Sequence, residues 1–170
     1  MLEGPGFSGI AVGSEEAIGT DALAGRATTQ AAPLCPSAQP DMPGAAVFAL
    51  VQGTVAEPRA AYLDRAVPAT HEILASAAPV APTEVFRIGA SCAGSCCQHS
   101  DGGRCRLAGR IVQLLPPVVT SAPPCALRPN CMWWRQEGVP ACLRCPQIVT
   151  RMYGAGPELV EAASPQKTPA

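Results

Sequence analysis

The fold is decided by residues 125–146, CALRPNCMWWRQEGVPACLRCP, in which four cysteines flank both tryptophans of the chain. Residues 92–105, CAGSCCQHSDGGRC, add four more, so eight of the nine cysteines lie between residues 92 and 145. The 170-residue chain also has 19 prolines, 16 glycines and few aromatic residues. A core made largely of alanine and valine buries little area, and at roughly 25 cal/mol per Å² it offsets only part of the entropy of ordering. We therefore expect a bound metal to stabilise the cysteine-rich part of the chain.

Three kinds of chemistry use such a density of cysteines: disulfides, zinc sites and iron-sulfur clusters. Disulfides need an oxidising compartment, whereas the N-terminus lacks the basic and apolar segments of a secretory signal, so a cytoplasmic location is expected. Zinc prefers paired ligands, and only Cys142 and Cys145 form a clean C-x2-C pair, although Cys96 and His99 would fit a second knuckle. Iron-sulfur clusters accept thiolates from separate loops, which suits the irregular spacing. A 4Fe-4S cluster is therefore expected, with zinc as the alternative cofactor.

The candidate cluster ligands are the cysteines that share this irregular spacing, namely Cys97, Cys105, Cys125, Cys131, Cys142 and Cys145. Cys92 is a further candidate metal ligand, Cys96 is a weaker one, and the distant Cys35 is expected to be a bystander. Pro146 fits the first turn of a helix, so Cys145 would lie at the positive end of the helix dipole, which favours a thiolate. Because one 4Fe-4S cluster uses four thiolates, the candidates either include spare cysteines or belong to two sites.

Composition divides the chain into four parts: a flexible tail over 1–44, a small α+β element over 45–91, the cysteine-rich module over 92–153 and a flexible C-terminal tail over 154–170. The expected fold class is α+β, with a hairpin and helix packed on a metal-stabilised module of short helices. The tail assignments rest on Gly, Ala, Ser, Thr and Pro without a sustained period of 2 or 3.6.

Hydrophobic patterns predict the elements inside these parts. Strands are expected over 46–55 and 60–64, as a hairpin, and a third extended segment over 83–90. Thr70 can cap a helix over 71–78. In the module, helices are expected over 104–115, capped by Ser100 or Asp101, between Asn130 and Gly138, and over 146–153.

The net charge of the chain gives no support for a large polyanion, such as nucleic acid, as a partner. The formal net charge is −1, and no apolar run is long enough to span a membrane, so a membrane role is not expected and nucleic acid is disfavoured. Between residues 92 and 151, seven arginines face only two acidic residues, a local excess that either binds an acidic partner or forms a solvated surface. No nucleotide-binding or hydrolase motif is present, so whether the chain is an enzyme stays open.

Two segments, CRLAGRIVQLLPPV (105–118) and PPCALRPNCMWWRQEGVPACLRCPQIVT (123–150), resemble a family of small cysteine-rich bacterial proteins, some of which are labelled nitrogen fixation proteins. The likeness extends more weakly through PTEVFRIGASC (82–92) and covers roughly residues 45–151. The resemblance implies a motif similar to C-x-H-x-D-G-x2-C, here Cys97, His99, Asp101, Gly102 and Cys105, to which Cys96 is additional. It implies no activity, and it makes His99 and Asp101 supporting or capping groups rather than catalytic ones.

The resulting hypothesis is an iron-sulfur protein that transfers electrons to a redox enzyme, or supports such an enzyme as an accessory subunit. The alternative is a zinc-stabilised interaction module that binds an acidic protein or nucleic-acid surface through its arginines. The sequence leaves the oligomeric state open.

Overall fold

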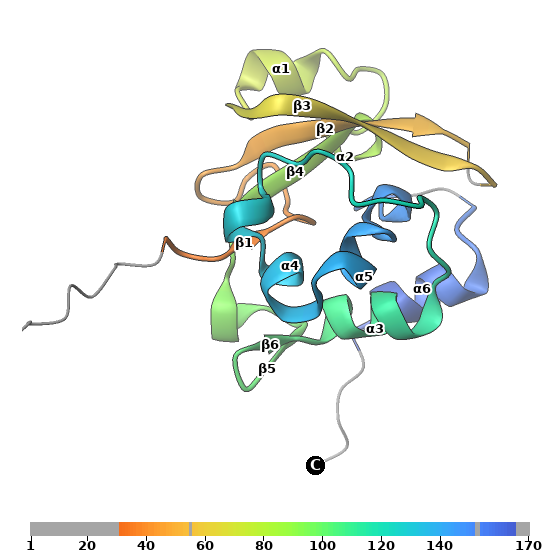
Figure 1. Ribbon diagram of the computed structural model, residues 1–170. Helices are drawn as coiled ribbons and strands as arrows, with labels where there is room; N and C mark the ends of the chain where they lie inside the picture. Colours follow the sequence, from red (N-terminus) through yellow and green to blue (C-terminus); the bar gives the residue numbers. More distant parts are fainter. Residues whose placement is uncertain (1–30, 55, 152–153, 166–170) are drawn as a thin grey trace, which may run out of the picture. The chain divides into compact units, whose positions relative to one another are not determined.

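The computed structural model describes residues 31–54, 56–151 and 154–165. Its strands are, in chain order, β1 (Leu34–Cys35), β2 (Ala46–Gly53), β3 (Pro58–Pro68), β4 (Phe86–Ser91), β5 (Ser100–Asp101) and β6 (Arg104–Cys105). Its α-helices are α1 (His71–Ala75), α2 (Pro82–Val85), α3 (Arg106–Leu114), α4 (Met132–Glu137), α5 (Val139–Cys142) and α6 (Pro157–Ala163). Short 3₁₀ helices are η1 (Gly94–Cys96), η2 (Arg128–Asn130) and η3 (Cys145–Gln147). The combination of helices with antiparallel sheets confirms the α+β class (Figure 1).

The main sheet has the strand order β1-β4-β2-β3, and each neighbouring pair is antiparallel. Strands β2 and β3 form the predicted hairpin, although β3 runs further than expected, to Pro68. Between them, the Thr54 hydroxyl accepts a hydrogen bond from the Glu57 backbone N–H at 3.1 Å. Strand β2, which is rich in β-branched and apolar residues, pairs with β3 on one side and with β4 on the other. It therefore lies in the interior of the sheet.

The connection from β3 to β4 contains one confirmed and one corrected element. Thr70 caps α1 as predicted, because its hydroxyl accepts from the Ile73 N–H at 3.3 Å. The extended segment expected over 83–90 is wrong in its first part, where Pro82 starts the helical turn α2. The Glu84 carboxylate accepts from the Ala81 N–H at 3.0 Å and fixes this turn, so the strand begins only at Phe86.

The flexible tail predicted over 1–44 is wrong in its last part, whereas residues 1–30 lie outside the described residues. Residues Leu34 and Cys35 form the edge strand β1 against β4. The Ala38 side chain is fully buried, and its N–H donates to the Ile88 carbonyl at 3.0 Å. A two-residue strand is too short to produce an alternating pattern, which is why composition alone suggested a tail.

The C-terminal tail predicted over 154–170 is likewise corrected for its described residues. Helix α6 packs against α3 with Ala162 fully buried, and Arg110 Nε donates to the Ala162 carbonyl at 2.8 Å. Pro157 in the first turn and the apolar residues that follow it favour this helix.

The helices of the cysteine-rich module follow the predictions only in part. Helix α3 lies within the predicted range, but its N-cap residue is Cys105, because Ser100 and Asp101 form the small hairpin β5–β6 instead. Helix α4 ends as predicted at Gly138, which has a φ of 65°. The helix predicted over 146–153 is wrong, since only η3 forms there and residues 152–153 lie outside the described residues.

Apolar residues cover both faces of the main sheet. On one face, Phe48 and Ala49 pack with Ile111, Trp133 and other residues of the module. On the other face, Val47, Ile88 and Ala77 form a second cluster with side chains of α1. Figure 1 shows this arrangement, with α1 on one side of the sheet and helices α3 to α6 on the other. Strand β4 is therefore buried on both faces from Phe86 to Ala90.

Removing residues 1–44 is expected to destabilise the protein, in comparison with removing residues 1–30. The longer deletion takes away β1 and the buried Ala38, a loss of about 2 kcal/mol, which lowers Tm by about 5 °C in a domain of this size. Thermal unfolding of the two truncated proteins, followed by circular dichroism, measures this difference. Equal melting temperatures would show that β1 contributes nothing to stability.

Candidate metal centre

The structure divides the cysteines into two groups rather than one site. The first group consists of Cys125, Cys131, Cys142 and Cys145, which line one cavity. The second group consists of Cys35, Cys92, Cys97 and Cys105, which line another. Cys96 is exposed and lines neither cavity, and all nine cysteines are free thiols. Every cysteine predicted as a ligand except the weaker candidate Cys96 thus belongs to a group, and Cys35, expected to be a bystander, belongs to one as well.

Short elements bring the first group together. Cys125 lies just before η2, and Cys131 is the N-cap residue of α4. Cys142 ends α5, and Cys145 begins the short 3₁₀ turn η3, which includes Pro146 and replaces the longer helix predicted there. The backbone N–H groups of Trp133 and Trp134 point to the Cys131 sulfur and favour its thiolate, as N–H groups at a helix start do.

Burial controls the protonation of these thiols. It raises the pKa of Cys131 to about 12, and Cys145 and Cys125 nearby add to the increase. Burial also raises the pKa of Cys125 and of Cys142, and the neighbouring Cys145 adds a smaller increase to each. Without a cation to bind, Cys125, Cys131 and Cys142 are therefore protonated at neutral pH.

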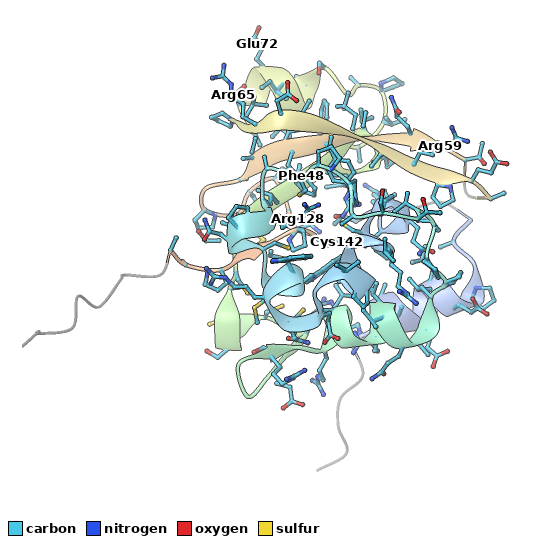
Figure 2. The ribbon with its side chains drawn as sticks, in the orientation of Figure 1. Phe48, Arg59, Arg65, Glu72, Arg128 and Cys142 are labelled. Carbon is cyan, nitrogen blue, oxygen red and sulfur yellow. The ribbon has the colours of Figure 1, made fainter. Side chains whose placement is uncertain are left out.

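Two guanidinium groups supply positive charge to the first group. Arg87 of β4 is only 2% exposed, and its Nη1 and Nη2 atoms donate to the Cys145 carbonyl at 2.5 Å and to the Cys145 sulfur at 3.4 Å. Arg128 stacks over the Trp134 ring at 5.3 Å and favours the Cys142 thiolate, which partly offsets the effect of burial. Figure 2 shows Phe48, Arg128 and Cys142 between the sheet and the helices, whereas Arg59, Arg65 and Glu72 point outwards.

Among the described residues, several buried donor atoms around the first group have no acceptor. They are Arg87 Nε, Arg128 Nε and Trp133 Nε1, whereas the Tyr62 hydroxyl forms a hydrogen bond with Cys145. Tyr62, Arg128 and Trp133 line the cavity of the first group, and Arg87 contacts Cys145. Burial and the adjacent Cys145 also raise the pKa of Tyr62, so its hydroxyl keeps its proton. Buried donors without partners are unusual in folded proteins, and here they surround one set of thiols.

The geometry does not provide a preformed site for a single ion. Within the described ranges, no three His, Cys, Asp or Glu side chains are arranged to hold one metal ion. The cavity of the first group measures about 20 Å³, which is close to the space of one water molecule. The donor set itself, soft sulfur atoms beside buried cations, is suited to thiophilic metals such as zinc and to iron-sulfur clusters.

Sequence reasoning missed three residues that support the cysteines. Cys35 and Arg87 are described above, and the third is Gln136 of α4. Its amide oxygen accepts from the Cys105 N–H at 2.7 Å, and its amide nitrogen donates to the Cys105 carbonyl at 3.0 Å. A detectable signal existed for Arg87, because an arginine between Phe86 and Ile88 in an apolar strand has no obvious route to solvent.

The arginine excess of the module is largely engaged in structural hydrogen bonds. Arg110, Arg128, Arg135 and Arg144 each donate to a backbone carbonyl, and Arg104 pairs with Glu137 at 3.7 Å. These contacts give the arginines a structural role and weaken the argument for a surface that binds acidic partners. Asp101 of β5 is exposed and caps no helix.

Comparisons with known proteins do not place the chain in a family: no protein-family model, no curated protein and no solved structure matches it. The resemblance to small cysteine-rich bacterial proteins therefore stays an expectation. Among the described helices, none has both the length and the apolar character that crossing a membrane requires.

Metal binding by the cysteines is expected to release protons and to strengthen as the pH rises. The raised pKa values of Cys125, Cys131 and Cys142 mean that each thiol loses a proton when it binds metal. With three protons released, the apparent affinity for zinc should rise up to roughly 1000-fold per pH unit near neutrality. Competition with a chelator at several pH values measures this slope, and an affinity independent of pH would contradict it.

Proposed function

We propose that this protein carries an iron-sulfur cluster on Cys125, Cys131, Cys142 and Cys145 and serves in electron transfer to, or support of, a redox enzyme. A 4Fe-4S cluster takes four thiolates, which is the number in the first group. Such a cluster supplies reversible one-electron chemistry at a potential that nearby charges and hydrogen bonds tune.

The observation that carries the proposal is the buried Arg87 guanidinium against Cys145. Arginine stays protonated in proteins, and a buried charge without a counter-charge costs several kcal/mol. Arg87 forms no ion pair with a carboxylate among the described residues, and its charged group meets the Cys145 sulfur and carbonyl instead. An anionic thiolate-bound centre would provide the missing negative charge.

The buried donors without acceptors support the same cofactor. The sulfide and thiolate sulfurs of a cluster accept hydrogen bonds, and these bonds adjust its potential. Arg128 Nε and Trp133 Nε1 are two such donors on residues that line the cavity, and the Tyr62 hydroxyl, which also lines it, already interacts with Cys145. Rings of Phe48, Trp133 and Trp134 also border it and would keep water away from the centre.

Electron transfer fits this site better than substrate chemistry does. Four cysteines can ligate all four irons, which leaves no open position for a substrate. The aromatic rings around the cavity also restrict the approach of a reactant. The first group therefore does not support a third possibility, an enzyme in which one iron keeps a free coordination position for substrate.

A zinc-stabilised module is the second candidate, and the small cavity favours it. A single ion needs less room than a cluster, and a volume of about 20 Å³ requires the side chains to separate before a cluster can fit. The same four thiolates are a common ligand set for structural zinc. The buried Arg87 cation and the donors without acceptors nevertheless favour a cluster over zinc, because the sulfide sulfurs of a cluster provide additional hydrogen-bond acceptors.

Protein purified without oxygen is expected to be brown, to contain iron and acid-labile sulfide, and to bleach with dithionite. Cys145→Ser should lose the iron held by the first group, because a serine oxygen is a poorer ligand for the cluster. Cys96→Ser is the matched control, since Cys96 is exposed and outside both groups, and it should keep its iron. Stoichiometric zinc without iron would instead establish the second candidate.

Replacing Arg87 is expected to shift the reduction potential in a direction set by its charge. Arg87→Met removes a positive charge and should lower the potential by on the order of 100 mV, or roughly 2 kcal/mol at an effective dielectric constant of about 20. Arg87→Lys keeps the charge and should shift the potential much less, although it loses part of the hydrogen bonding. Equal potentials in the two variants, measured by redox titration, would remove Arg87 as a source of the tuning.

A further inference from the structure

We propose that the second group, Cys35, Cys92, Cys97 and Cys105, holds a second iron-sulfur cluster, with Cys35 as an essential ligand. This inference rests on the proposed function for the type of cofactor, but it uses a separate set of residues. None of the four cysteines lines the cavity of the first group.

Pairing of β1 with β4 brings the most distant cysteine to this site. Cys35 pairs with Ala90 in register, and the Cys92 N–H donates to the Pro33 carbonyl at 2.8 Å. The end of β4 and the N-terminal segment therefore run side by side, which places Cys35 and Cys92 at the same edge of the sheet. Cys97 follows η1, and Cys105 ends β6.

The four thiols share one cavity. Cys35 lies on the edge strand β1, Cys92 follows β4, and Cys97 and Cys105 line the same cavity from the segment after β4. Soft thiolate ligands that meet in one cavity are suited to iron-sulfur clusters.

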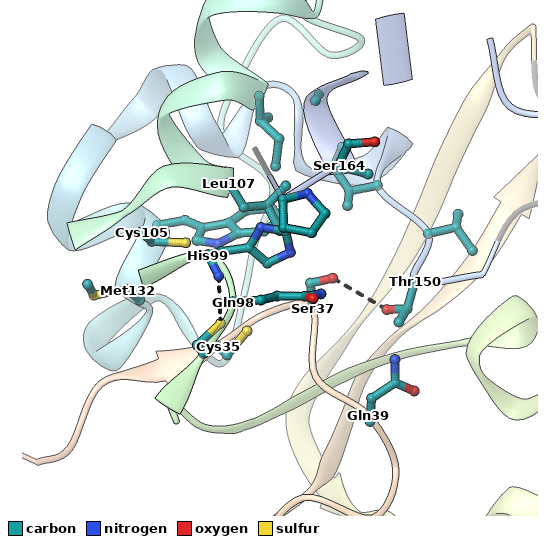
Figure 3. Close-up of a pocket in the computed structure, with 18 of the residues that line it drawn as sticks. Cys35, Ser37, Gln39, Gln98, His99, Cys105, Leu107, Met132, Thr150 and Ser164 are labelled. Carbon is teal, nitrogen blue, oxygen red and sulfur yellow. Dashed lines mark hydrogen bonds between the residues drawn. The ribbon is translucent and has the colours of Figure 1, made fainter. Parts of the chain in front are cut away.

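The cavity that these cysteines line has room for a cluster. It measures about 600 Å³, within the range of pockets that hold drug-sized ligands, and a four-iron cluster is smaller than such a ligand. Figure 3 shows Cys35, His99 and Cys105 at the same end of this cavity, away from Ser164. The cavity therefore has the volume for a cluster, although, as in the first group, the thiols are not preformed around a single ion.

Groups around the second cavity are arranged to support thiolates. The backbone N–H of His99 donates to the Cys97 sulfur at 3.4 Å. Arg110 Nη2 lies 3.1 Å from His99 Nδ1 and, as a cation, can only donate, so Nδ1 accepts and the proton of the neutral ring is on Nε2. This tautomer leaves the ring without a free lone pair for a zinc ion shared with Cys96.

Trp133 connects the two sites, since it lines both cavities and is only 2% exposed. Gln136, on the same helix, holds the backbone of Cys105 with two hydrogen bonds. Helix α4 therefore starts at Cys131, a proposed ligand of the first group, and through Gln136 it holds the backbone of Cys105, a proposed ligand of the second group. Two clusters separated by one buried aromatic residue form a short path for electrons, which deepens the proposed role in electron transfer.

The test compares four proteins prepared without oxygen and assayed for iron, acid-labile sulfide and the electron paramagnetic resonance of the reduced state. They are the wild type, the first-group variant Cys142→Ser/Cys145→Ser, the second-group variant Cys35→Ser/Cys105→Ser, and Cys96→Ser as the control. The wild type and Cys96→Ser should contain about eight irons, with a spectrum of interacting spins. Each double variant should contain about four and show the spectrum of one isolated cluster.

The outcomes separate this inference from the proposed function. About four irons in both the wild type and the second-group variant would overturn the second cluster and leave the first intact. About four irons in both the wild type and the first-group variant would overturn the first cluster and support the second. Iron in neither the wild type nor any variant would overturn both. Because a second-group variant that keeps a cluster on the first group must be folded, its remaining iron excludes simple misfolding as the cause of the loss.

Discussion

The arrangement of the cysteines depends on the buried guanidinium of Arg87. This side chain extends from β4, donates to the Pro36 carbonyl at 3.2 Å and to the Cys145 carbonyl at 2.5 Å, and lies over the Phe48 ring. One cation therefore joins the N-terminal segment, the sheet and the end of the cysteine-rich module, which are far apart in the sequence. Hydrogen bonds to carbonyls satisfy part of its donor capacity, but they leave its charge without an anion, which the proposed thiolate-bound centre on the first group would supply.

The elements that local sequence determines were predictable. The hairpin of β2 and β3, the Thr70 cap and the helices α3 and α4 follow from alternation, helical spacing and a terminal glycine. Failures occurred where tertiary contacts decide the structure. Strand β1 has too few residues to show a period, and helix α6 gains its stability from packing on α3.

The residues of the candidate site could be anticipated, but their division into two groups could not. Density and irregular spacing predicted thiolate ligation, which stays a prediction, and the C-x2-C-P motif placed Cys145 at the start of a helical turn, where η3 forms. The grouping depends on which loops meet at the edge of the sheet, and spacing along the chain does not contain that information. Cys35 lies far from the other cysteines in sequence, so only the β1–β4 register reveals its neighbours.

Pairing between β1 and β4 also affects the order in which the chain assembles. It closes the whole segment from Cys35 to Ala90 into a loop, and the entropy of closing such a loop must be overcome before two residues of pairing can compensate for it. The β2–β3 hairpin joins neighbours in sequence and has no comparable barrier. We infer that β1 is added to a sheet that has already formed. During synthesis, Cys35 leaves the ribosome well before β4 does, and its thiol stays unprotected until the strand that shelters it has been made.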